Sequence, residues 1–99
     1  MKLKGDTALI SLTGSIDERG AEEIKRRFLE LELSSLKEVI LDFSGVSFIG
    51  SAGIGKLLLL YKNLTAHGGM IIIKNMSKDI HTMFKVVKLD KIFTLEVAE

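Results

Sequence analysis

A glycine-rich segment that carries one serine and one lysine is the part of the chain whose residue types could support chemistry. Between positions 50 and 56 the sequence reads GSAGIGK. The segment stands where a strand pattern gives way to a helix pattern, and such junctions gather exposed backbone N–H groups. It is therefore a candidate for binding phosphate or for presenting a reactive hydroxyl.

Three enzyme motifs are excluded by the residues that they lack. The spacing from Gly50 to Lys56 fits a phosphate-binding P-loop, but Leu57 stands where magnesium needs Ser or Thr. The glycine order differs from the dinucleotide fingerprint, and Ile49 replaces a glycine of the hydrolase elbow. Two histidines and no cysteine give no metal-ligand pattern. We therefore predict no enzymatic activity, no cofactor and no metal site.

Ser51 has more than one interpretation. A serine at a helix N-terminus is commonly a cap, and this is the favoured reading from the residue alone. Phosphorylation is the alternative, because a phosphate of about −1.5 to −2 charges is tolerated at the positive end of a helix and still opposes docking of a partner there. A third hypothesis makes the glycine-rich turn a small-anion or nucleotide site without catalysis.

The elements that position this segment follow from the hydrophobic periodicity. The predicted elements are a hairpin from Lys2 with a strand over 7–12, helix 18–34, strand 39–41, loop 44–50, helix 51–67 closed by Gly68 and Gly69, strand 70–73, a helix capped by Ser77, and strand 93–97. The apolar stripe of the helix after Ser77 is Ile80, Met83, Phe84 and Val87. The continuous apolar run at 39–41 is typical of a strand covered on both faces. This order predicts an α/β layer sandwich with a mixed sheet of about five strands and three to four helices, in a single domain over 1–99.

The helix after Ser51 is expected to expose one leucine. A helical wheel places Leu59 among small and polar residues, opposite the stripe that we expect to be buried. That stripe consists of Ile54, Leu57, Leu58, Tyr61 and Leu64. Leu59 is thus a candidate partner contact, although a single exposed leucine is also an ordinary surface feature.

Composition limits the class of protein. Hydrophobic residues make up 46% of the 99 and charged residues 27%, with a net charge of +1, which excludes both a disordered acidic tail and a polycation. The C-terminal third is mildly basic, a pattern typical of a solvated face, so we expect no direct nucleic-acid binding. The absence of cysteine, of a signal peptide at residues 1–5 and of a long apolar run predicts a cytoplasmic protein without membrane insertion.

The chain resembles a STAS domain of the bacterial anti-sigma factor antagonist family over its whole length. The resemblance rests on LTGSID at 12–17, on LDFSGVSFIGSAGIG at 41–55, and on YK at 61–62 followed by GGM at 68–70. It implies that Ser51 is phosphorylated by an anti-sigma factor that is itself a serine kinase. The family usually has aspartate immediately before this serine, where the present sequence has Gly50.

The resemblance implies a partner switch that regulates transcription. The unmodified antagonist binds the kinase and frees a sigma factor, phosphorylation of Ser51 breaks that complex, and a phosphatase restores it. We expect five residues to contact the kinase: Asp17, Gly50, Ala52, Gly53 and Leu59. STAS domains also serve in membrane transport and stress-sensing complexes, so a permanent interaction module is the alternative function.

Overall fold

A five-stranded mixed sheet forms the centre of the computed structural model, which describes residues 2–32 and 35–98. The strands are in chain order across the sheet, and only the first pair is antiparallel. The strands are β1 (Lys2–Lys4), β2 (Thr7–Ile16), β3 (Glu38–Ile49), β4 (Met70–Met76) and β5 (Thr94–Val97). The predicted hairpin is confirmed, with Gly5 at φ +61° in its turn.

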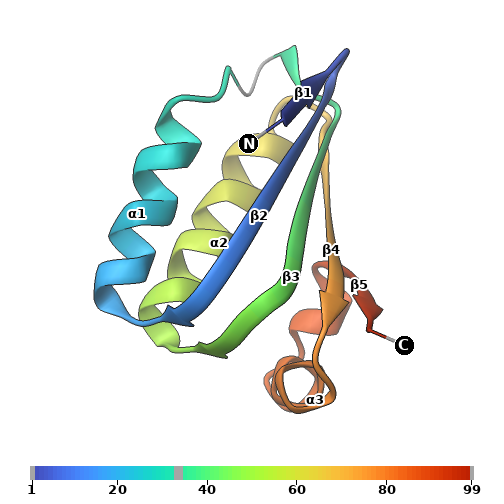
Figure 1. Cartoon of the computed structure of the whole chain (residues 1–99). Helices are drawn as coiled ribbons and strands as arrows, with labels where there is room; N and C mark the ends of the chain where they lie inside the picture. The colour runs from blue at the N-terminus through green and yellow to red at the C-terminus, as the bar shows by residue number, and fades with distance from the viewer. Residues whose placement is uncertain (1, 33–34, 99) are drawn as a thin grey trace.

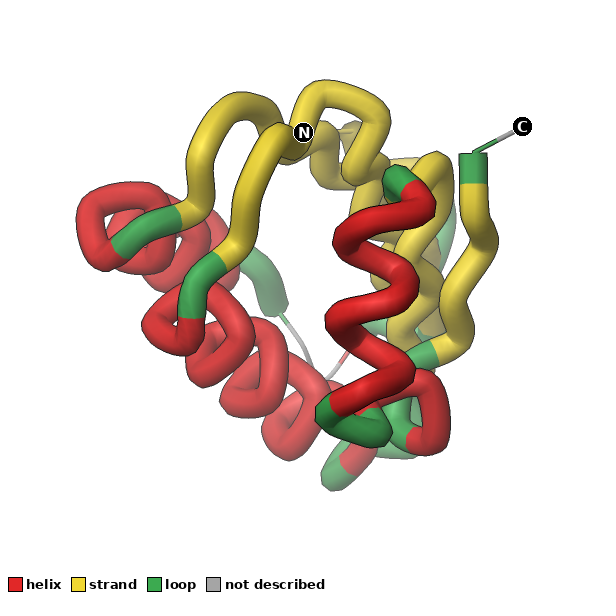
Figure 2. Tube along the Cα trace, turned by 90° about the horizontal axis from the view of Figure 1, so that it is seen from below, coloured by secondary structure: helices red, strands yellow, loops and turns green. Residues whose placement is uncertain are grey.

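The helices all lie on one side of this sheet (Figures 1 and 2). They are α1 (Glu18–Leu29), α2 (Ser51–Thr65), α3 (Lys78–Val86) and the 3₁₀ helix η2 (Leu89–Lys91). The predicted α/β class, with a mixed five-stranded sheet and three to four helices, is confirmed. None of the helices in the described part of the chain has the length and hydropathy needed to cross a membrane.

One hydrophobic core fills the space between the sheet and the helices. Ile10, Leu41 and Ile73 are paired neighbours on β2, β3 and β4, and all three are fully buried against the helices. Ile40 and Ile72 are paired on the opposite face and do not belong to this core. The prediction that residues 39–41 are covered on both faces is therefore wrong, because helices cover one face only.

The first helix ends earlier than the periodicity predicts. It stops at Leu29 instead of continuing to 34, and positions 33–34 lie outside the described residues. The N–H groups of Glu30 and Leu31 donate to carbonyls three residues back, which tightens the last turn and ends the helix. Leu31 is buried and stands three residues after Phe28, which is helical spacing. The sequence pattern therefore predicts that the helix continues past its actual end.

The predicted loop at 44–50 is wrong, because β3 continues to Ile49. Val46 and Ile49 are buried, and they pair with Gly14 and Ile16 on β2. Register shifts interrupt this pairing, so the burial pattern loses its strict alternation. The polar and glycine residues that indicate a loop belong instead to an irregular strand.

Glycines stand beyond both ends of helix α2, which ends at Thr65, two residues before the predicted end. Gly50 is its N-cap, and at the other end Gly68 adopts φ +79° while the N–H of Gly69 donates to Leu64 O at 3.0 Å, as predicted for a left-handed C-terminus. The predicted buried stripe is correct at Leu57 and Leu64. The other predicted stripe residues are only partly buried, whereas Leu60 and Gly53 are fully buried.

Two predictions for α3 have opposite outcomes. Ser77 is its N-cap, as predicted, and its hydroxyl accepts the Ile80 N–H at 3.2 Å. Val87 was expected on the apolar stripe but is exposed, because the helix has already ended at Val86.

Gly53 allows α2 to lie directly on the ends of two strands. A Cβ at this position would lie 2.6 Å from Ile16 Cγ2 and 2.9 Å from Ile49 Cγ1, closer than side chains tolerate. Gly55 lies two residues further along the helix and faces open space, with no atom within 4 Å of an added Cβ. The first turn of α2 is therefore placed by backbone contact at Gly53 and not at Gly55.

This contrast predicts opposite effects of one extra methyl group. Gly53→Ala should lower the free energy of unfolding by about 1–3 kcal/mol, because it overpacks the contact with β2 and β3. Gly55→Ala should raise it by about 0.5–1 kcal/mol, because alanine is the better helix former. Urea denaturation measures both changes, and a neutral Gly53→Ala would contradict the close packing described here.

Candidate functional site

The ends of β2 and β3 bring two helix N-termini together. Ile16 and Ile49 are paired at the ends of these strands, and the Gly50 N–H donates to Ile16 O at 2.9 Å. Asp17, the N-cap of α1, follows Ile16, and Gly50, the N-cap of α2, follows Ile49, so the two helices begin next to each other (Figure 1). We call Asp17, Gly50, Ser51 and Ala52 the helix-entry corner.

Ser51 is exposed in the first turn of α2. The prediction that Ser51 caps the helix is wrong, because Ser51 is the first residue of the helix. The N-cap is Gly50, and no side chain makes a capping hydrogen bond there. Among the described residues, the Ser51 hydroxyl has no hydrogen-bond partner. Its oxygen is thus free of a structural role and accessible to another protein.

The ring of Phe48 lies close to Gly50, the N-cap of α2. The backbone of Gly50 is extended, with φ −98° and ψ −179°, which any residue adopts. A Cβ here would lie 3.3 Å from Cε2 of Phe48, whose side chain is 53% exposed and can shift. The backbone at Gly50 therefore has the conformation that the family's usual aspartate could also take.

Asp17 is the N-cap of α1. Its carboxylate accepts the Gly20 N–H at 3.0 Å, and this hydrogen bond is the main reason that the pKa of Asp17 lies below its ordinary value. The side chain is exposed and is charged at neutral pH. The helix-entry corner thus holds one fixed negative charge, at the start of α1.

A groove between α1 and α2 continues from this corner. It is lined by Glu18, Ala21 and Glu22 of α1 and by Ala52, Gly55, Lys56 and Leu59 of α2. An ion pair joins its two sides, with Lys56 Nζ 3.7 Å from Glu22 Oε1. Leu59 is 45% exposed, as predicted, and small residues leave it open to contact. We call this surface the α1–α2 groove.

The groove ends in an apolar hollow. Leu59 and Leu60 of α2 face Phe28 and Leu29 of α1 there, with Lys25 and Asn63 at the rim. Leu29 is the most exposed large hydrophobic residue described, at 76%. An exposed surface of this kind is typical of a protein-binding site.

The structure places the predicted contact residues at different depths. Asp17 and Leu59 are exposed, Gly50 and Ala52 are half-buried, and Gly53 is buried beneath α2. Any contribution of Gly53 to docking therefore comes through the position of the helix.

The exposure of Phe48 and Leu29 was not predicted from the sequence. Phe48 stands in an apolar stretch of the sequence, which is typical of a buried ring, but it follows the register shift in β3 and is exposed. Leu29 is the last residue of α1 and belongs to no buried stripe. A wheel of α1 indicates that position 29 lies off its core face, whereas nothing in the sequence marks the shift before Phe48.

The described residues contain no group of three or more His, Asp or Glu side chains placed to hold a metal ion. Lys56 pairs with Glu22 on the α1 side of the helix. The arrangement is that of an exposed hydroxyl at one end of the α1–α2 groove.

Comparison with known proteins places the chain in a family. A family model described as the STAS domain matches residues 1–99. The chain belongs to the STAS domain family. STAS domains of this kind are typically interaction modules.

Solved structures share the fold of this STAS domain at low sequence identity. The Bacillus cell fate determinant SpoIIAA in its phosphorylated form is 24% identical, with a TM-score of 0.74 over 96% of this chain and 86% of that one. A putative anti-sigma factor antagonist from Thermotoga maritima is 19% identical, with a TM-score of 0.86 over 96% and 82%. A sulfate transporter family protein from Wolinella succinogenes is 13% identical, with a TM-score of 0.81 over 97% and 80%.

The cap at Asp17 predicts a pH dependence of stability. Because folding lowers the pKa of this carboxyl, its stabilisation is complete above the unfolded pKa and is lost as pH falls through the folded pKa. The variant Asp17→Ser keeps a neutral cap. The stability difference between wild type and this variant should be constant near pH 7 and shrink below about pH 4. Thermal unfolding across this range measures it, and a difference that grows in acid would contradict the role of the charge.

Proposed function

We propose that this STAS domain is an anti-sigma factor antagonist that binds an anti-sigma factor serine kinase through the helix-entry corner and the α1–α2 groove. Phosphorylation of Ser51 by that kinase ends the complex, and a phosphatase restores it. The domain acts in the cytoplasm as a non-enzymatic regulator of transcription.

The observation that carries this proposal is the state of the Ser51 hydroxyl. It is exposed, has no hydrogen-bond partner among the described residues and stands at the positive end of a 15-residue helix. A kinase can reach it without unfolding any element. The fold does not use this oxygen, so its modification leaves the packing beneath α2 intact.

The electrostatics of the corner favour a switch over a simple structural site. Amide dipoles of α2 stabilise a phosphate on Ser51 by about 0.3–1 kcal/mol, whereas the negative charge of Asp17, at the start of α1, opposes it. In the free domain both charges remain hydrated. In a complex a docked surface removes that water, and burying an uncompensated charge costs about 2–5 kcal/mol.

The α1–α2 groove supplies the affinity that phosphorylation then opposes. Leu59, Leu29 and Phe48 present apolar side chains around the corner and along the groove. Burial of a leucine contributes about 1.5–3 kcal/mol, so a few such contacts balance the penalty of one phosphate. This similarity of magnitude allows a single modification to change the bound fraction.

A constitutive interaction module in a membrane transport complex is the second candidate. It is supported by the fold shared with a sulfate transporter family protein and with the SulP transporter STAS domain from Vibrio cholerae, which has a TM-score of 0.68. Gly50 also fits it, because a permanent interface needs no acidic contact beside Ser51.

The switch predicts modification at one serine. Incubation with the serine-kinase anti-sigma factor and ATP should add one phosphate to Ser51, detected by mass spectrometry of peptides. Ser51→Asp should weaken kinase binding at least about tenfold, because it places a charge in the interface. Ser51→Ala should bind like the wild type and remain unmodified.

The matched control places the same charge away from the corner. Thr82→Asp changes an exposed residue of α3 and should leave kinase binding unchanged. Circular dichroism should show that all three variants keep the fold. Phosphate at a different residue, or full binding by Ser51→Asp, would contradict the proposal.

The second candidate predicts a stable complex with membrane subunits. The tagged domain should then co-purify with transport subunits from detergent-solubilised membranes, and Ser51→Asp should not reduce their recovery. Recovery of a soluble serine kinase that is lost on phosphorylation would instead reject this candidate.

A further inference from the structure

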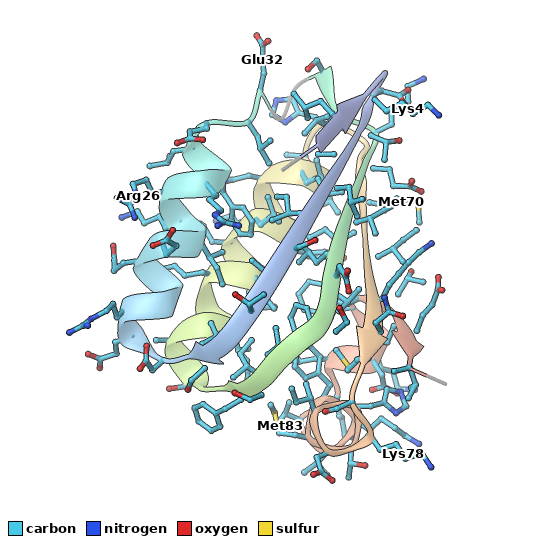
Figure 3. All side chains as sticks on the ribbon, viewed as in Figure 1. Lys4, Arg26, Glu32, Met70, Lys78 and Met83 are labelled. Carbon is cyan, nitrogen blue, oxygen red and sulfur yellow. The ribbon has the colours of Figure 1, made fainter. Side chains whose placement is uncertain are left out.

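The sheet face opposite the helices is not covered by the described part of the chain. Figure 3 shows Met70 on this side, away from α1 and the labelled Arg26. An apolar row crosses the middle of the face, formed by Leu9, Ile40 and Ile72, which are paired neighbours on β2, β3 and β4. Leu9 is 37% exposed, and the two isoleucines are outside the core. We call this surface the open face.

Opposite charges lie next to the apolar row. Asp42 on β3 is paired with Lys74 on β4, two residues along each strand from Ile40 and Ile72 and on the same face. The Asp42 carboxylate accepts the Ser44 N–H at 2.9 Å and the Asn75 amide at 3.1 Å, so it is held in place and its pKa is lowered. Lys74 has no ion pair among the described residues.

The other side of the apolar row has a different charge pattern. There Glu38 on β3 is paired with Met70 on β4. The open face thus carries a Glu38–Met70 row, an Ile40–Ile72 row and an Asp42–Lys74 row in succession. Such a pattern discriminates between the ways in which two copies can stack.

Two symmetric arrangements of a second copy can be compared. A two-fold axis across the strands stacks β3 on β3 and reverses its direction, which sets Glu38 against Asp42 of the second copy. Like charges oppose this arrangement. An axis along the strands, between β3 and β4, stacks β3 on β4 instead. It sets Ile40 against Ile72, and Asp42 against Lys74, at both symmetry-related places.

We propose that the open face binds a second copy of this chain, with a two-fold axis along the strands between β3 and β4. Each Asp42 then faces Lys74 of the other copy, and the apolar rows stack between the sheets. Packed sheets cross at about −30°, but these rows lie next to the axis, where twist displaces them least. The open face and the helices are on opposite sides, so each copy keeps its helix-entry corner free.

The size of the open face sets the strength of this dimer. Four strands at a spacing of about 4.8 Å, with about five residues each, present a surface of roughly 15 Å by 17 Å. This area is well below that of a standard interface of about 800 Å² per partner. The dimer should therefore be weak, populated between micromolar and millimolar protein.

The test uses charge exchange in the intact chain. Lys74→Glu and Asp42→Lys each set two pairs of like charges across the axis, so each variant alone should raise the dimer dissociation constant at least about tenfold. In an equimolar mixture every such pair becomes opposite in charge, and dimers should return. Sedimentation equilibrium over a concentration series measures all three samples and the wild type.

Matched controls separate this geometry from general charge attraction. Lys62→Glu changes an exposed lysine of α2 by the same charge, and alone it should dimerise like the wild type. Mixed with Asp42→Lys it leaves one opposite and one like pair across the axis, so these mixed dimers should be weaker than those of the two charge variants. If Asp42→Lys does not fold, Ile72→Glu should still abolish the dimer while Leu29→Glu, on the helix side, retains it. A wild-type monomer at millimolar concentration would overturn the proposal. Failure of the two charge variants to recombine, or a mixed dimer of Lys62→Glu and Asp42→Lys as tight as theirs, would do the same.

Discussion

The hydrogen bond from the Gly50 N–H to the Ile16 carbonyl is the constraint on which the functional surface depends. It joins the last residue of β2 to the residue that precedes α2, at 2.9 Å. Close contact at Gly53 then holds the first turn of α2 against both strand ends. As a result, two helices begin side by side, and the residues that begin them are exposed together.

This construction separates the Ser51 hydroxyl from the groups that stabilise the fold. The caps and backbone contacts are provided by Asp17, Gly50 and Gly53, whereas Ser51 takes part in none of them. A site built in this way can gain a dianion without losing a hydrogen bond. The cost of the charge is then incurred in a complex, where water is removed from it, and not in the free domain.

Sequence periodicity predicted the class and order of the elements because most buried side chains obey a period of two or 3.6. The hairpin, the left-handed end of α2 at Gly68 and the cap at Ser77 were predictable for the same local reason. The length of β3 was not, because register shifts against β2 place Val46 and Ile49 in the core without alternation. One-sided cover of the sheet was also not predictable, since a strand with a weakly exposed Ile40 has the same composition as a fully enclosed strand.

The candidate site was predictable in part. The exposure of Leu59 followed from the helical wheel, and the start of a helix at Ser51 followed from the change of period and the glycines around it. The cap was assigned to Ser51 instead of Gly50 because side-chain capping preferences cannot show that a backbone contact shifts the helix start by one residue. The outward direction of Phe48 arises from non-local strand pairing, which a single sequence does not display.

Calorimetric titration of the serine-kinase anti-sigma factor with domain carrying phosphoserine at position 51, beside unmodified domain, is the most direct test of the central claim. Amide NMR spectra of the two free forms should differ only around the helix-entry corner, because the fold does not use the hydroxyl. The account predicts that the phosphorylated form binds at least about tenfold more weakly. Equal affinities, or a spectrum that changes throughout the core, would contradict it.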